Sequence, residues 1–259
     1  MSLATTPLWI LGTMIVVVPT MLAMAGPVIA RRVIGLPRLA TNNEVAGFKF
    51  ATVGVLYAVL LAFVVIVVWE KFSDAEADVS REAGAAATLY RLIGGIDAPT
   101  QQEIRDRLTA YLTSAVNDDW KAMETGRSSR KTTQALTALY ATALAYQPKD
   151  PRTTEIMAEI LDQLHHITEA RRARLVKALG AVPGVIWLVL FGGALLTIGF
   201  TFFFGTENLH AQSLMTGVLA LLIFSGLLVI VAIDRPFTGT VKVEPTGLIE
   251  VIDDLGRAR

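Results

Sequence analysis

The sequence predicts an all-α integral membrane protein: four transmembrane helices, with a long helical domain inserted between spans two and three. Of its 259 residues, 53% are hydrophobic and only 18% are charged, whereas soluble domains carry about 25% charged residues. The apolar residues gather in four blocks of about 20 residues, the length that a helix needs to cross a bilayer. The one long polar segment, residues 70–182, has helical start signals and no alternating strand pattern.

The first two predicted spans form an N-terminal helix pair, residues 1–69. The first runs from Leu8 to Ala30 and lacks the preceding Lys or Arg of a secretory signal, so we expect a retained helix. The second runs from Phe48 to Trp69, whose indole suits the water interface. Its small residues recur at every fourth position, a pattern that favours close approach of another helix: Gly54, Ala58 and Ala62.

Residues 70–182 are predicted to form a helical extramembrane domain. No helix breaker follows the second span before the sequence GGIDAP, so this span should continue to about Ile96 as one helix. Further along, Asp150 followed by Pro151 is typical of a helix start and marks the last helix of the domain.

The remaining spans are predicted to form a second transmembrane hairpin, residues 183–234, because only the sequence GTENLHAQ separates their two apolar blocks. A C-terminal tail, residues 235–259, follows. Its Pro and Gly residues argue against a long helix, and the sequence TVKVEP suits a short strand or an extended segment.

Several function classes find no support in the composition. The chain has 23 basic and 23 acidic residues, so its charge gives no indication of a nucleic-acid partner. The absence of cysteine excludes disulfides, thiolate catalysis and cysteine-ligated zinc. The sequence contains no nucleotide-binding loop, Ser-His-Asp arrangement or metalloprotease motif, and we expect no enzyme.

Four acids follow the second span at intervals of four residues and are the candidate pore or ion residues: Glu70, Asp74, Asp78 and Glu82. A step of four residues displaces a side chain by about 40° around a helix, so the acids form one slanting stripe. In a symmetric oligomer with this helix near the axis, each acid becomes a ring that concentrates cations. The alternative is a solvated helix face whose acids pair with Arg and Lys of neighbouring helices.

Three further groups of polar residues each have a functional and a structural interpretation. A candidate vestibule, or a helix cap, precedes the second span and comprises Asn42, Asn43, Glu44 and Lys49. Asp234 and Arg235 follow the last span directly. This acid and base suggest a structural clasp, in which they pair with each other or with Glu70 and Lys71. Carboxylates and a histidine share a face of the domain's last helix and suit a wet surface better than a metal site: Glu159, Asp162, His166 and Glu169.

Two stretches resemble the bestrophin-like domain family of bacterial membrane proteins. Residues 42–92 resemble its signature, NNEVAGFKFATVGVLYAVLLAFVVIVVWEKFSDAEADVSREAGAAATLYRL, and residues 232–245, AIDRPFTGTVKVEP, resemble its ending. The family name reflects a likeness to bestrophins, which are pentameric anion channels with four spans per subunit and cytoplasmic central and terminal segments. The resemblance thus implies a channel and a cytoplasmic central domain, although basic residues lie in loops on both sides of the spans.

Together these features favour a homo-oligomeric, bestrophin-like ion channel of about four or five subunits in a bacterial inner membrane. We expect the second span to line the pore and the channel to conduct cations or respond to calcium. One alternative is a membrane-anchored scaffold or sensor whose helical domain binds a protein partner, and another is an anion channel. The expected partners are the lipid bilayer, further copies and ions, without nucleic acid; no cofactor is expected apart from calcium, which an acidic ring could bind.

Overall fold

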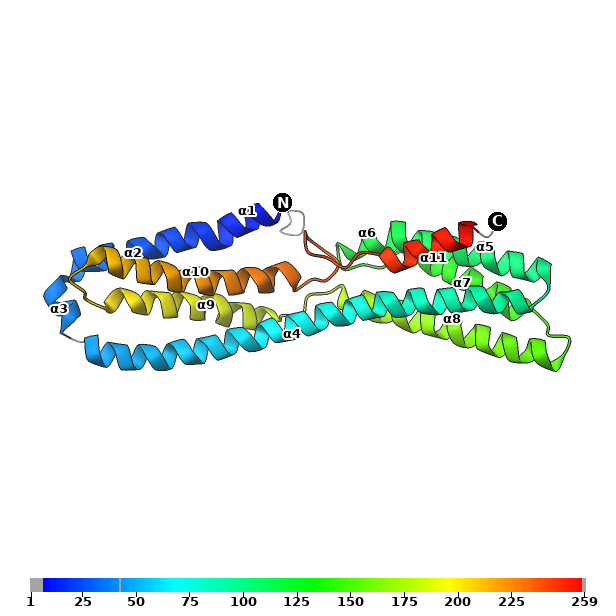
Figure 1. Cartoon of the computed structure of the whole chain (residues 1–259), viewed down its shortest axis with the longest axis horizontal. Helices are drawn as coiled ribbons and strands as arrows, with labels where there is room; N and C mark the ends of the chain where they lie inside the picture. The colour runs from blue at the N-terminus through cyan, green and yellow to red at the C-terminus, as the bar shows by residue number, and fades with distance from the viewer. Residues whose placement is uncertain (1–6, 42, 258–259) are drawn as a thin grey trace. The chain divides into compact units, whose positions relative to one another are not determined.

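The computed structural model describes residues 7–41 and 43–257, and every regular element in that part of the chain is a helix, which confirms the all-α prediction (Figure 1). Contacts within the chain divide it into two compact units. Unit 1 comprises Met1–Glu70, Gly180–Asp234 and Gly239–Val241. Unit 2 comprises Lys71–Leu179, Arg235–Thr238 and Lys242–Arg259.

Four helices of the described chain are long and apolar enough to cross a bilayer, as the sequence predicts: Leu8–Ile34, Asn43–Gly95, Gly184–Phe203 and Leu209–Ile233. The first of these consists of α1 (Leu8–Gly12), the π-helical turn η2 (Thr13–Val17) and α2 (Val18–Ile34). The other helices of unit 1 are the short α3 (Leu36–Ala40), the first part of α4 (Asn43–Leu92), α9 (Gly184–Phe200) with the 3₁₀ turn η5 (Thr201–Phe203), and α10 (Leu209–Ile233).

Glycines let α4 approach its neighbours in unit 1 closely. A methyl group at Gly193 of α9 would lie 2.6 Å from the Tyr57 ring, and one at Gly226 of α10 would lie 2.8 Å from Leu61. A methyl group at Gly54 would meet no atom within 4 Å. The small-residue stripe that begins at Gly54 therefore faces away from these packing contacts and stays a predicted surface for another copy.

Helix α4 runs without a turn from Asn43 to Leu92, which confirms that the second span continues as one helix. At about 1.5 Å per residue it is about 75 Å long. It ends in the 3₁₀ turn η3 (Ile93–Gly95), next to the predicted end at Ile96.

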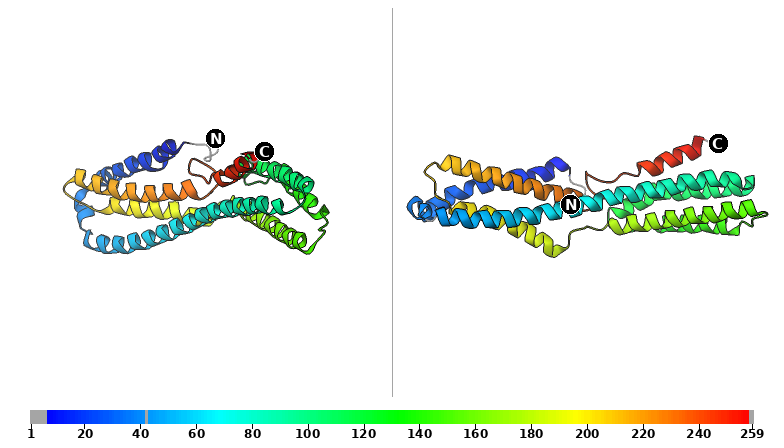
Figure 2. Two further views of the ribbon diagram at one scale, coloured as in Figure 1. Left: turned by 45° about the vertical axis from the view of Figure 1, so that its right-hand side comes forward. Right: turned by 60° about the horizontal axis from the view of Figure 1, so that its bottom comes forward.

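Unit 2 is a bundle in which α5, α7 and α8 run beside the second part of α4 (Figure 2). Its helices are α5 (Ala98–Ser114), the π-helical turn η4 (Ala115–Asp119), α6 (Trp120–Met123), α7 (Arg130–Ala145), α8 (Pro151–Lys177) and α11 (Thr246–Arg257). The predicted start of α8 is confirmed, because the Asp150 carboxylate accepts a hydrogen bond from Thr153 N at 2.9 Å in a capping box.

The tail contains a helix, α11, that the sequence analysis missed. Its Gly247 lies in the first turn, where a glycine interrupts few helical hydrogen bonds. An apolar stripe of Leu248, Val251 and Leu255 is buried, so packing offsets the weak local preference. The preceding residues, Val241–Pro245, lie outside regular elements.

Candidate functional site

Helix α4 has two contrasting faces within unit 1. Tyr57, Val64 and Val68 are buried, and the Tyr57 hydroxyl donates a hydrogen bond to Leu190 O at 3.0 Å. The opposite face carries bulky apolar side chains that are exposed: Val55, Val59, Phe63 and Ile66. A span helix that buries one narrow stripe in its own chain leaves the other face for lipid or for another copy.

The four predicted acids fall into two pairs with different surroundings. Glu70 and Asp74 are exposed on α4, where they continue the outward apolar face. Asp78 and Glu82 are 0% exposed. The stripe is therefore continuous along the helix, but its far half is covered by unit 2.

Basic side chains surround Asp78. Lys177 Nζ of α8 lies 2.7 Å from Asp78 Oδ2, and Arg81 Nη2 lies 2.5 Å from Asp78 Oδ1. Lys177 also approaches Asp74 Oδ2, at 3.7 Å. Lys177 is a partner from a neighbouring helix, of the kind that the alternative interpretation of the acid stripe expects, whereas Arg81 lies on α4 itself.

Glu82 lies in a buried polar cluster. Arg174 donates hydrogen bonds to its two carboxylate oxygens at 2.8 and 3.1 Å, and the Tyr111 hydroxyl donates a third at 2.6 Å. Burial, and next the charge of Glu82, raise the pKa of Tyr111 well above its ordinary value. Burial alone would lower the pKa of Arg174, but the charge and hydrogen bonds of Glu82 raise it, so Arg174 keeps its positive charge.

A second buried ion pair adjoins the first. Arg171 donates to both carboxylate oxygens of Asp119 at 2.7 and 3.2 Å, and Ser129 N donates to Asp119 at 2.8 Å. Arg174 links the two pairs, with its Nη2 3.5 Å from Asp119 Oδ2. Its guanidinium also lies 4.4 Å from the centre of the Trp120 ring.

This cluster was not recognised in the sequence, although α8 carries a signal for it. The buried residues of α8 include Ile160, Leu164 and Ile167, and the same spacing of three and four residues continues to Arg171 and Arg174. An arginine on the apolar face of a helix indicates a buried carboxylate partner. The identity of that partner, more than 50 residues away, depends on the tertiary fold.

The other predicted residues are distributed over both units. In unit 1, Asn43 Nδ2 donates to Gly205 O at 2.6 Å and Gly205 N donates to Asn43 Oδ1 at 2.9 Å, while Glu44 and Lys49 are exposed. Asn42 lies outside the described residues. The role of this group as a vestibule or cap stays a prediction.

The end of the last span forms contacts with the chain before the third span. The Asp234 carboxylate accepts hydrogen bonds from Ala181 N and Val182 N, both at 2.8 Å. Arg235 is exposed. Asp234 thus joins the end of α10 to the segment that leads into α9.

The histidines of α8 form exposed pairs with acids, and both approach Glu169, with His166 Nδ1 4.0 Å from its carboxylate. His165 Nε2 lies 3.2 Å from Glu169, and His166 Nε2 lies 3.2 Å from Asp162. Within residues 7–41 and 43–257, no group of three or more His, Asp or Glu side chains has a geometry that could hold a metal ion.

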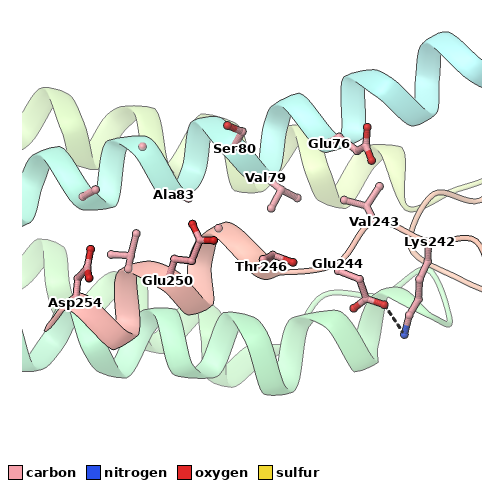
Figure 3. A pocket seen from close by; sticks show the side chains of 14 residues that line it. Glu76, Val79, Ser80, Ala83, Lys242, Val243, Glu244, Thr246, Glu250 and Asp254 are labelled. Carbon is pink, nitrogen blue, oxygen red and sulfur yellow. Dashed lines mark ion pairs between the residues drawn. The ribbon is translucent and has the colours of Figure 1, made fainter. Parts of the chain in front are cut away.

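A groove of about 640 Å³ lies between α4 and α11 in unit 2 (Figure 3). Small side chains of α4, among them Ser80 and Ala83, line one wall. The groove also carries several acids and one base: Glu76, Glu244, Glu250, Asp254 and Lys242. Lys242 Nζ lies 3.7 Å from Glu244. The acidic lining of the groove suits a basic side chain.

Comparison with known proteins identifies the family. The sequence model of the Bestrophin-like domain matches residues 17–248. Two crystal structures of single-substitution variants of a bacterial bestrophin homologue from Klebsiella pneumoniae are similar in fold, each with a TM-score of 0.73 at 15% identity. The alignments cover 92% and 93% of this chain, and 97% of each relative.

A third structure of the Klebsiella pneumoniae bestrophin homologue, solved by Zn-SAD phasing, has a TM-score of 0.70 and 15% identity over 92% of this chain and 96% of that chain. No curated protein matches the sequence. The family match covers most of the chain and includes both stretches in which the sequence resembles that family. The protein therefore belongs to the Bestrophin-like domain family.

Proposed function

We propose that the protein is a subunit of a homo-oligomeric ion channel whose pore is lined by the outward face of α4. Family membership and the fold of the bestrophin homologues support the channel class. The observation that carries the proposal is the unbroken passage, on one helix, from the exposed apolar stripe to exposed Glu70 and Asp74. About four or five copies around an axis would turn this face into a pore wall.

The pore has two parts in this proposal. Bulky apolar side chains such as Phe63 and Ile66 form a dry constriction that resists wetting when closed. Beyond it, rings of Glu70 and Asp74 raise the local concentration of cations. Asp78 and Glu82 contribute little to this field, because basic groups of their own chain neutralise them. Cation conduction is therefore assigned to the first two acids of the predicted set.

Calcium is the proposed regulatory ligand. Carboxylates brought together in a ring repel one another, and a bound divalent cation relieves that repulsion. Calcium accepts several oxygen ligands in flexible geometry, so rings of Glu70 or Asp74 could bind it without a dedicated loop. The proposal includes no other cofactor and no enzymatic reaction.

The proposed topology places four spans in a bacterial inner membrane. Residues 1–69 and 183–234 hold the two span pairs, residues 70–182 form a helical extramembrane domain between spans two and three, and 235–259 form the tail. The domain and the tail are assigned to the cytoplasm. The length and apolar character of the four helices support the multi-pass arrangement.

A membrane-anchored scaffold or sensor is the second candidate, and the acidic groove between α4 and α11 is the observation that favours it. A protein partner would place basic side chains there. A scaffold needs no axial opening, so subunit arrangement and conductance separate the two candidates.

The channel proposal is tested by recording currents from the purified protein in planar bilayers under a potassium chloride gradient. We expect single-channel steps whose reversal potential lies near the equilibrium potential of potassium. A reversal potential near the equilibrium potential of chloride would replace the cation assignment with the anion alternative. Silent bilayers, with correct insertion verified by protease protection, would support the scaffold.

A further inference from the structure

Two connections of unit 1 are joined to each other at one end of its helices. Arg31 Nη1, at the end of α2, donates to Thr206 O at 3.3 Å and to Glu207 O at 3.2 Å. The paired hydrogen bonds between Asn43 and Gly205 tie the start of α4 to the same connection. Side chains around these contacts therefore have defined positions rather than those of free loops.

Short helix α3 lies within the first connection (Figure 1). Gly35, with φ at 91°, turns the chain out of α2, a conformation that glycine adopts without strain. Leu39 is only 5% exposed and anchors α3 in unit 1, whereas Arg38 beside it is exposed. The anchor keeps the Arg38 guanidinium on the surface at the end of the first span.

Exposed cations and exposed apolar side chains alternate at this end. Arg32, Arg38 and Lys49 are exposed and together are called the cationic rim. Val33 is 78% exposed and Phe48 is 80% exposed, next in sequence to Arg32 and Lys49. With Arg31, four basic residues lie here, against two acids, Glu44 and Glu207.

We propose that the cationic rim binds the phosphate headgroups of anionic phospholipids. The boundary of a bilayer places phosphates next to acyl chains, and the rim offers cations beside the exposed apolar side chains of Val33 and Phe48. Arginine binds phosphate through two parallel hydrogen bonds, which a neutral side chain cannot replace. The proposal concerns the lipid around the spans and does not depend on ion conduction.

The expected loss of affinity for anionic lipid follows from the number of cations removed. Each Lys or Arg near an anionic lipid surface strengthens association about fivefold. Removing Arg32 and Arg38 should thus weaken the binding of an anionic lipid about thirtyfold. Neutral-headgroup lipid lacks net negative charge and should be unaffected.

The test titrates full-length protein in mild detergent with phosphatidylglycerol or phosphatidylcholine and counts bound lipids by native mass spectrometry. The parent should retain more phosphatidylglycerol than phosphatidylcholine. Arg32→Gln with Arg38→Gln should lose that preference, and Arg130→Gln with Arg152→Gln, two exposed arginines of unit 2, should keep it. Equal retention of both lipids by the parent, or an unchanged preference in the first variant, overturns the proposal.

Two further measurements separate the effect of charge from that of misfolding, and a lipid site from a site for free phosphate. Arg32→Lys with Arg38→Lys keeps both charges but loses the paired hydrogen bonds, so it should retain part of the preference. A loss as complete as in the glutamine variant would assign the effect to packing and overturn the proposal. Inorganic phosphate should not displace bound phosphatidylglycerol, because it lacks acyl chains to contact Val33 and Phe48. Displacement by phosphate would show an anion site rather than a lipid surface and would also overturn it.

Discussion

Replacing Arg174 with methionine should destabilise unit 2 by about 3 to 5 kcal/mol. Arg174 is fully buried and donates two hydrogen bonds to Glu82, at 2.8 and 3.1 Å. Methionine fills much of the same volume, so the main loss is electrostatic. It leaves the Glu82 carboxylate buried without its cation, and one hydroxyl donor, that of Tyr111, cannot compensate for this.

Hydrogen exchange of the α8 amides, followed by mass spectrometry in the full-length protein, measures this effect. A tenfold change in an equilibrium corresponds to about 1.4 kcal/mol, so amides that exchange by opening of unit 2 should exchange about 140 to 3,700 times faster. Removing both partners, as Glu82→Leu with Arg174→Met, should restore part of the protection, because the Glu82 carboxylate is then no longer buried without its cation.

Arg172→Met provides the matched control, because Arg172 lies on the same helix and is exposed. In this variant the opening free energy measured from the α8 amides should change by no more than about 0.5 kcal/mol. If Arg174→Met exchanged like Arg172→Met, the ion pair would contribute nothing to the stability of unit 2, and the reasoning from burial would be refuted.

Three further predictions concern packing and titration. Ala58→Leu on the outward face of α4 should reduce the oligomer fraction measured by mass photometry in detergent, and an unchanged mass distribution would contradict the small-residue contact. Gly193→Leu should lower the melting temperature, because overpacking against Tyr57 costs about 1 to 3 kcal/mol. Equal melting temperatures of variant and parent would contradict the close contact between α4 and α9. Tyr111 has a raised pKa, so its contribution to stability is complete below the ordinary value of 10.0 and is lost as pH rises above it. The stability gap between the parent and Tyr111→Phe, measured by urea unfolding, should narrow above that pH, and a constant gap would contradict the shift.

The sequence was sufficient to predict the spans and the long helix. Four apolar blocks predict four span helices, and the absence of a breaker after Trp69 predicts α4, because both depend on local composition. The start of α8 at Pro151 also follows from a local signal, the preceding Asp150.

The division of the acid stripe could not be predicted in the same way. Helical spacing places Asp78 and Glu82 on a stripe with Glu70 and Asp74, but spacing carries no information on which part another helix covers. Arg174, which covers Glu82, lies 92 residues further along the chain. Helix α11 was missed for a related reason, since its stability comes from burial of its apolar stripe rather than from helix propensity.

The pore assignment is tested most directly by the reversal potential of Glu70→Gln with Asp74→Asn, recorded in planar bilayers under a potassium chloride gradient. Glu155→Gln with Asp253→Asn removes the same charges at exposed positions of α8 and α11, outside the proposed pore wall, and is the control. If rings of Glu70 and Asp74 attract cations, the first variant should shift toward the chloride potential while the control stays at the parent value. The same reversal potential in the parent and both variants would contradict the assignment of these acids to the pore.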